Sequence, residues 1–136
     1  MEVRIYYEDT DAGGVVYHSN YISYMERART EFLRTHGLSV REMHDKGIIF
    51  PVVHIDANFR APARLDDLLV VRTQIAVLKN SSFTVAQQVV RKDDEKLLVE
   101  ARVTLACVSP EMKAKRLPNE IRELFTRLLE ENPQEG

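Results

Sequence analysis

Asp11 and His18 are the two residues whose types and spacing point most directly to chemistry. They flank a connection that contains Gly13 and Gly14, between an alternating strand and a run with helical periodicity. A free aspartate is ionised at neutral pH, so its carboxylate can attack an acyl carbon or draw a proton from water. The backbone N–H of His18, at the helix entry, can stabilise the oxyanion that forms. The stretch is therefore a candidate hydrolytic site, although a short glycine motif on its own favours a polar, capped strand-to-helix loop without chemistry.

The other histidines and the single cysteine have simpler interpretations. His36 is expected at a helix end, where an imidazolium suits the dipole, and His44 on the surface of a short helix. His54 and Asp56 are two residues apart on a strand and lack a third metal ligand at recognisable spacing, so no metal site is predicted. Cys107 falls in the apolar register of its strand and is expected in the core.

Length, composition and charge narrow the class of protein. The 136 residues are 44% hydrophobic and 29% charged, so we expect a single folded domain over residues 1–136. A net charge of −2 gives no reason to expect a nucleic-acid partner. We see no signal peptide and no integral membrane segment, and one cysteine cannot form an internal disulfide, so a cytoplasmic location is expected. No nucleophile-elbow serine motif or phosphate-binding glycine loop is present.

The pattern of apolar residues predicts an α+β chain. A strand over 3–8 is followed by a helix over 20–36, with Ser19 expected as its N-cap and Gly37 just past its end. The buried stripe of this helix is predicted to contain Ile22, Met25, Ala28, Arg29, Phe32 and Leu33. The order continues with further helical turns over 39–46, strands over 48–59, 69–77, 82–91 and 97–107, and a helix over 119–130. The last six residues are expected to fray. One long helix across the concave face of a curved antiparallel sheet suits this order.

Two longer blocks resemble a known family. Residues 7–21, YEDTDAGGVVYHSNY, followed by residues 24–33, YMERARTEFL, resemble the hotdog-fold acyl-CoA thioesterases of the 4-hydroxybenzoyl-CoA thioesterase type. The subgroup that they resemble most is the bacterial Tol–Pal-associated acyl-CoA thioesterases, which the block over residues 61–67 also matches. The resemblance spans roughly Arg4 to Pro118.

This resemblance implies a hotdog fold, with a long central helix wrapped by a curved antiparallel β-sheet. It implies a homodimer or homotetramer with active sites at a subunit interface, and an enzyme that hydrolyses acyl-CoA to free acid and CoA. No cofactor is implied, because CoA is part of the substrate. The family's catalytic aspartate falls on Asp11, as nucleophile or general base, and the amide that polarises the thioester carbonyl falls on His18.

Substrate contacts are expected from Gly14, Tyr17 and Asn20, which share this motif. The hydroxybenzoyl enzyme holds the nucleotide phosphates with a basic cluster near its second hairpin, and here that stretch keeps only the charge of Lys79. Arg60 and Arg64 are the alternative phosphate ligands. Candidates for the apolar pocket walls are Ile49, Phe50 and Val52.

Two other interpretations stay open. An acyl carrier protein, rather than CoA, is a candidate carrier of the acyl group. The chain is also compatible with a non-catalytic or weakly catalytic hotdog protein that binds an acyl carrier protein or a cell-envelope-associated complex. A dehydratase of the related hotdog families is a third interpretation, although its motifs differ from those present here.

Overall fold

The computed structural model describes residues 1–132. Its elements are β1 (Glu2–Arg4), the 3₁₀ helix η1 (Tyr7–Asp9), α1 (His18–Thr35), α2 (Val40–Asp45), β2 (Val52–Phe59), β3 (Leu68–Leu78), β4 (Ser82–Arg91), β5 (Leu97–Ala106) and α3 (Asn119–Glu131). Within residues 1–132 this is the predicted order of strand, long helix, antiparallel strands and terminal helix. Of the six residues that were expected to fray, 133–136 lie outside the described residues, and Glu131 ends α3.

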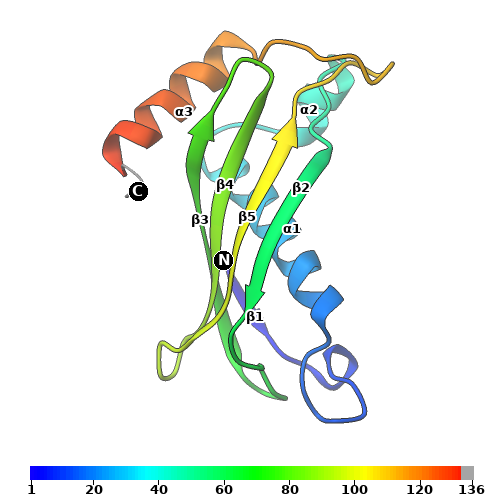
Figure 1. Cartoon of the computed structure of the whole chain (residues 1–136), viewed down its shortest axis with the longest axis vertical. Coiled ribbons are helices and arrows are strands. Elements are labelled where there is room, and N and C mark those ends of the chain that lie inside the picture. The colour runs from blue at the N-terminus through cyan, green and yellow to red at the C-terminus, as the bar shows by residue number, and fades with distance from the viewer. Residues whose placement is uncertain (133–136) are drawn as a thin grey trace. The chain divides into compact units, whose positions relative to one another are not determined.

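The strands form one antiparallel sheet in the order β1-β3-β4-β5-β2 (Figure 1). β1 pairs with β3 in the register Glu2↔Val70, Val3↔Leu69 and Arg4↔Leu68. Leu69, Val71 and Ile75 of β3 are buried, as expected for side chains that alternate between the faces of a strand. β1 and β2 occupy the two edges of the sheet.

The described residues group into two compact units. The first unit contains Met1–Leu38, Ala57–Thr73 and Gln87–Ala101. The second contains Ser39–Asp56, Gln74–Ala86 and the described residues from Arg102 on. Strands β2, β3, β4 and β5 each contribute residues to both units, whereas α1 belongs wholly to the first. The expected single domain over residues 1–136 stays a prediction.

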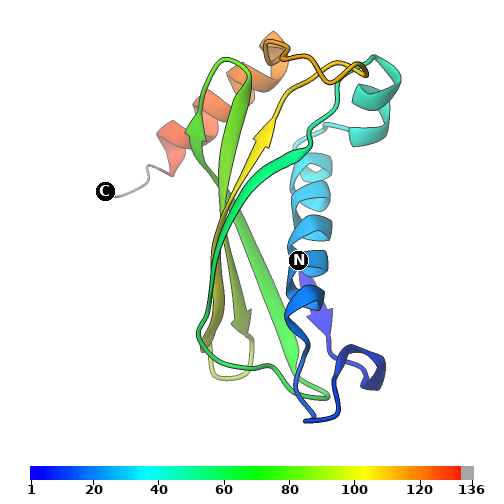
Figure 2. The same ribbon diagram turned by 45° about the vertical axis from the view of Figure 1, so that its right-hand side comes forward.

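In the first unit, α1 packs against the sheet (Figure 2). Its buried residues are Tyr21, Tyr24, Met25, Ala28 and Leu33. These side chains share a core with Ile5, Val16, Ala63, Leu69, Val71, Val89, Leu98, Val99 and Ala101. Gln87 is the one buried polar residue among those described, and its amide donates to the Met25 carbonyl oxygen at 2.9 Å and to the Thr73 hydroxyl at 3.0 Å. This pairing ties the middle of α1 to the sheet.

In the second unit, aromatic rings join α3 to β4. The Phe83 ring lies 4.9 Å from that of Phe125 and 5.6 Å from that of Phe50, measured between centroids. Ile121 and Leu124 complete the buried face of α3. Aromatic side chains bury large apolar areas, so this cluster contributes to the core of the unit.

Three local expectations were wrong. The first strand ends at Arg4 and not at Glu8, because the Tyr6 N–H donates to the Asp9 carboxylate at 2.8 Å and the chain turns into η1. Helix α1 begins at His18, so Ser19 lies inside it and the N-cap is Tyr17. The strand expected over 48–59 begins at Val52, after Ile49 has formed an isolated bridge with Val108.

The buried stripe of α1 was also only partly predicted. Met25, Ala28 and Leu33 are buried, whereas Ile22, Arg29 and Phe32 are only half-buried. The two tyrosines Tyr21 and Tyr24 were not in the predicted stripe and are 2% and 3% exposed. Gly37, by contrast, has the expected left-handed conformation at a φ of 81°.

Candidate active site

Asp11 lies on an exposed turn that precedes α1. The turn is closed by the Gly14 N–H, which donates to the Asp11 carbonyl oxygen at 3.0 Å, and by an antiparallel bridge between Thr10 and Val16. One carboxylate oxygen of Asp11, Oδ1, accepts hydrogen bonds from the N–H groups of Gly13 at 2.8 Å and Val15 at 3.4 Å. Among the described residues the other oxygen, Oδ2, accepts no hydrogen bond. The carboxylate is therefore held by the backbone with one oxygen free to react.

Each of the two glycines in this turn suits its position for a different physical reason. A Cβ placed on Gly13 would meet Asp11 Oδ1 at 3.2 Å, closer than most Cβ contacts, so glycine leaves room for the carboxylate. Gly14 has a φ of 79°, in the left-handed region that side chains disfavour, although nothing lies within 4 Å of its notional Cβ. Gly13 thus leaves space for the Asp11 carboxylate, and Gly14 allows the left-handed backbone conformation of the turn.

The N-terminus of α1 is uncapped within residues 1–132. Tyr17 is the N-cap and its side chain accepts no bond from the first turn, which also contains no acidic residue. The Asn20 N–H donates to the Tyr17 carbonyl oxygen at 2.9 Å, whereas the N–H groups of His18 and Ser19 have no partner among the described residues. These amides and the helix dipole create a region of positive potential that suits a carbonyl oxygen as it gains negative charge.

A cavity of about 210 Å³ opens beside this helix end. It is lined by Val15, Val16, His18 and Tyr21 on one side and by residues 59–62 on the other. The His18 ring is exposed and lies 4.6 Å from the Phe59 ring, centroid to centroid, so Phe59 supports its orientation. Asp11 does not line the cavity but precedes it on the same turn.

Two buried tyrosines support the start of α1. The Tyr21 hydroxyl accepts a hydrogen bond from the Ala63 N–H at 2.9 Å, and burial raises the pKa of Tyr21. Burial also raises the pKa of Tyr24, and the nearby Asp9 carboxylate adds to the shift. Within the described residues the Tyr24 hydroxyl has no acceptor in hydrogen-bond geometry. Both phenols consequently stay protonated at neutral pH and add no charge to the site.

Comparison with known proteins shows to which family the chain belongs. A family model described as the thioesterase superfamily matches residues 13–104, more than half of the chain. The chain belongs to the thioesterase superfamily. It is similar to the acyl-CoA thioester hydrolase YbgC of Escherichia coli O6:H1, with 45% identity over 120 residues that cover 88% of this chain and 89% of the relative. It is also similar to the acyl-CoA thioesterase YbgC of Haemophilus influenzae, with 39% identity over 128 residues and 93% of each chain covered.

A solved structure supports the same assignment. The 1,4-dihydroxy-2-naphthoyl-CoA thioesterase Slr0204 from Synechocystis superposes with a TM-score of 0.87 at 28% identity, covering 94% of this chain and 95% of that one. The predicted family, the α+β hotdog fold and the thioester hydrolase class are therefore confirmed. The roles of individual residues in this thioesterase stay predictions.

The structure places the predicted phosphate ligands at different points. Arg60 lines the cavity, and its guanidinium forms an exposed ion pair with Glu100. Arg64 bridges to Val15 through its backbone, and its side chain is exposed. Lys79 belongs to the second unit, at the connection between β3 and β4. Of the three predicted phosphate ligands, Arg60 is thus the one that lines the same cavity as His18.

The remaining predicted contacts of the helix entry have defined surroundings. The Asn20 amide donates to the Asp9 carbonyl oxygen at 2.8 Å, so this side chain fastens η1 to α1. Tyr17 is 59% exposed beside the helix end. The structure thus leaves Tyr17 open to a ligand, whereas the amide of Asn20 already has a partner.

The other histidines and Cys107 lie outside the cavity beside α1. His36 caps α1, with Nδ1 at 2.8 Å from the Phe32 carbonyl oxygen, and His44 is exposed on α2. Cys107 is fully buried, and burial raises the pKa of its thiol. His54 is exposed on β2, and within residues 1–132 no group of three or more potential ligands could hold a metal ion.

None of the helices described is long and apolar enough to cross a membrane.

Sequence reasoning missed Phe59 and Tyr21 as parts of the site. Tyr21 lies inside the quoted motif, but it was not among the residues expected to be buried or to contact a ligand. Phe59 ends a strand that is distant in sequence, so nothing local signalled that it would contact His18.

The glycines of the Asp11 turn yield a prediction. Gly14→Ala should lower the free energy of unfolding by about 1–2 kcal/mol through left-handed strain. Gly13→Ala should lower thioester hydrolysis about 10-fold through a displaced carboxylate, with a smaller loss of stability. Urea unfolding and initial rates on the same preparations measure both effects.

Gly37→Ala is the matched control for strain, since its φ is 81° and nothing lies within 4 Å of its notional Cβ. It should lose stability as Gly14→Ala does and keep its activity. Full hydrolysis by Gly13→Ala would show that the close approach to Asp11 is unimportant.

Proposed function

We propose that this chain hydrolyses the thioester of acyl-CoA, with Asp11 and the amide of His18 as the reacting and stabilising groups. The observation that carries the proposal is an uncapped N-terminus of α1 that follows a turn with a backbone-held carboxylate. These two features can supply what thioester hydrolysis needs, because a carbonyl oxygen must be stabilised while its carbon is attacked. The YbgC relatives, whose names specify acyl-CoA, supply the substrate class.

The chemistry follows from the two groups. The thioester carbonyl oxygen would accept hydrogen bonds from the free N–H groups of His18 and Ser19, which polarise the carbon. Asp11 Oδ2 would then act in one of two ways. As a nucleophile it forms a mixed anhydride and releases CoA thiolate, and water afterwards hydrolyses the anhydride. As a general base it takes a proton from water, which attacks the carbon directly and expels the thiolate.

The His18 ring has a separate role in this proposal. It is exposed and packs on Phe59 at the cavity, where it can orient water or protonate the departing sulfur. Arg60 is the cavity residue whose charge suits the CoA phosphates, and binding would require it to leave Glu100. An acyl carrier protein presents its acyl group through a phosphopantetheine arm as well, so it remains an alternative carrier.

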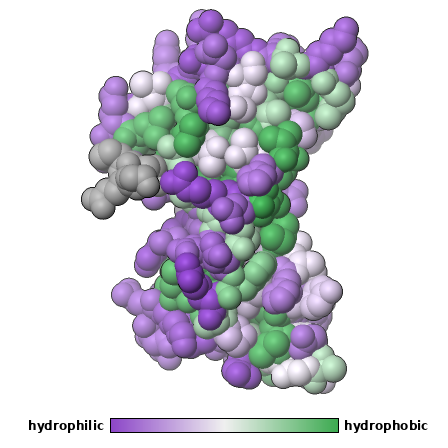
Figure 3. Space-filling model, viewed as in Figure 1, coloured by the Kyte–Doolittle hydropathy of each residue, from purple (hydrophilic) through white to green (hydrophobic). Residues whose placement is uncertain are grey.

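A homodimer joined through β2 is part of the proposal. β2 is an edge strand and exposes four large apolar side chains: Val52, Val53, Ile55 and Phe59. Figure 3, in the orientation of Figure 1, shows hydrophobic surface in green on the side where β2 runs. An exposed apolar edge strand is a template for pairing with another chain, and a second copy would cover it.

The Asp11 assignment predicts the behaviour of Asp11→Asn. This variant keeps the shape of the side chain and should lose at least about 100-fold in kcat towards acyl-CoA, because the amide can neither attack nor accept a proton. Released thiol, measured over a panel of aliphatic and aromatic acyl-CoA esters, reports the rate. An acyl-enzyme trapped on Asp11, or solvent oxygen incorporated into it in one turnover, would identify the nucleophilic route.

Asp45→Asn is the control, since Asp45 is exposed at the end of α2 in the other unit. It should hydrolyse the panel as wild type does. Wild-type rates in Asp11→Asn would reject the assignment. No hydrolysis of any CoA ester by folded wild type would reject acyl-CoA as the substrate, and acyl carrier protein thioesters would be tested next.

The interface proposal predicts that Val53→Lys combined with Ile55→Lys yields a monomer, because two charges on the edge oppose strand pairing. Sedimentation velocity measures the change. Val40→Lys, a charge on another exposed valine in α2, should leave the dimer intact. A wild-type monomer, or a double variant that remains dimeric, would contradict pairing through β2.

A further inference from the structure

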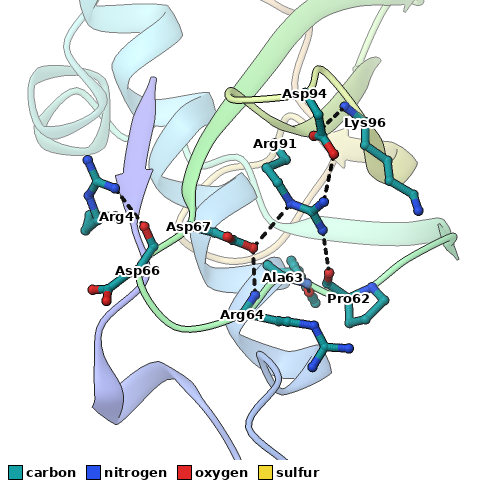
Figure 4. Close-up of polar contacts among 10 residues, drawn as sticks. Arg4, Pro62, Ala63, Arg64, Asp66, Asp67, Arg91, Asp94 and Lys96 are labelled. Atoms are coloured by element: carbon teal, nitrogen blue, oxygen red, sulfur yellow. Dashed lines mark hydrogen bonds and ion pairs between the residues drawn. The ribbon is translucent and has the colours of Figure 1, made fainter.

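Arg91, the last residue of β4, makes polar contacts with every nitrogen of its guanidinium. One terminal nitrogen donates to Asp94 Oδ2 at 2.9 Å and the other to the Pro62 carbonyl oxygen at 3.1 Å (Figure 4). The buried Nε lies 3.3 Å from Asp67 Oδ2, as an ion pair without hydrogen-bond geometry. Its side chain is 21% exposed, so these contacts are partly shielded from water. Arg91 thereby joins the end of β4 to both sides of the 62–67 loop, which connects β2 to β3.

The 62–67 loop is held in one shape by Asp67. Asp67 Oδ2 accepts the Arg64 N–H at 2.9 Å, and the Asp67 N–H donates to the Arg64 carbonyl oxygen at 3.1 Å. Ile5 pairs with the same loop, since its N–H donates to the Asp67 carbonyl oxygen and its own carbonyl oxygen accepts the Asp66 N–H, both at 2.9 Å. Arg91 is the side chain that contacts both Asp67 and Pro62.

Ala63, between those two points, connects the loop to the site. It is fully buried, so its backbone groups need partners. Its N–H donates to the Tyr21 hydroxyl at 2.9 Å, and its carbonyl oxygen accepts the Val16 N–H at 2.9 Å. Arg64, the next residue, bridges to Val15. The position of Ala63 therefore sets both the end of the Asp11 turn and the first turn of α1.

We propose that Arg91 is a positioning residue for thioester hydrolysis, which holds the 62–67 loop and, through Ala63, aligns the Asp11 turn with the N-terminus of α1. This role rests on the proposed function. Arg91 touches neither Asp11 nor His18, so it acts through Pro62, Asp67 and Ala63 and not on the substrate. The planar guanidinium donates to Asp94 and Pro62 in fixed directions while its Nε faces Asp67, and the compact ammonium of lysine cannot span these three positions.

The kinetic test compares Arg91→Gln with Lys92→Gln. Arg91→Gln should lower kcat about 100-fold with little change in KM, because the alignment of reacting groups is lost while substrate contacts remain. Arg91→Lys should recover only part of kcat. Lys92→Gln removes the same charge from the neighbouring position, where Lys92 pairs with exposed Glu2, and should match wild type.

Amide hydrogen exchange tests the same alignment without activity. In Arg91→Gln the amides of Val16 and Ala63 should exchange at least about 10-fold faster, while the amides of Phe83 and Val85 in the second unit keep their rates. If Arg91→Gln does not fold, Asp67→Asn replaces it, since an amide oxygen still accepts the Arg64 N–H but loses the charge that faces Arg91. Asp67→Asn should show the same selective pattern.

Selective faster exchange together with reduced kcat supports the proposal. Wild-type kcat in Arg91→Gln overturns it, and so does faster exchange spread evenly over both units, which would indicate general destabilisation. If wild type hydrolyses no acyl-CoA, the proposed function fails, and the exchange experiment alone decides. Selectively faster exchange at Val16 and Ala63 would then still support a structural connection from Arg91 to the Asp11 turn, and unchanged exchange at both residues would reject that connection.

Discussion

The uncapped N-terminus of α1 is the constraint on which the rest of the site depends. A helix without a side-chain cap loses about 1 kcal/mol relative to a capped one. α1 tolerates this loss because its buried face, which includes Tyr21, Met25 and Ala28, is fixed in the core of the first unit. The amides that a serine or aspartate would otherwise occupy stay free for a carbonyl oxygen. Packing along the helix thus stabilises α1 even though its N-terminus is uncapped, as expected where a rigid scaffold holds a preorganised site.

The turn that carries Asp11 depends on this helix and on a distant loop. Its local hydrogen bonds hold the carboxylate against the N–H of Gly13, and its far end is fixed by the bond from the Val16 N–H to the Ala63 carbonyl oxygen. Ala63 in turn is bound to Tyr21 of α1. The Asp11 turn and the first turn of α1 are therefore both held by hydrogen bonds to the same buried residue, Ala63. This arrangement lets a side chain at the end of β4 influence chemistry that it does not touch.

Much of this architecture could be predicted from the sequence, and the failures have physical causes. Asp11, the glycines and His18 are contiguous, so their joint pattern is visible in one stretch. Ser19 was expected to cap α1, but the long-range bond between Val16 and Ala63 fixes the chain so that the helix begins at His18. Arg91 could not be recognised, since its partner Pro62 is 29 residues away and only the folded sheet brings them together. Local patterns predicted elements and chemistry, while contacts between elements required the structure.

A crystal structure of the protein with a ketone analogue of acyl-CoA, in which a methylene group replaces the thioester sulfur, would directly test the proposed roles of Asp11 and His18. The analogue keeps the carbonyl and cannot be hydrolysed. If Asp11 and the His18 amide act as proposed, the carbonyl oxygen of the analogue lies within hydrogen-bond distance of the His18 N–H, and the Asp11 carboxylate faces the carbonyl carbon directly or through one water molecule. A carbonyl bound away from the N-terminus of α1, with Asp11 directed at bulk solvent, would contradict these roles.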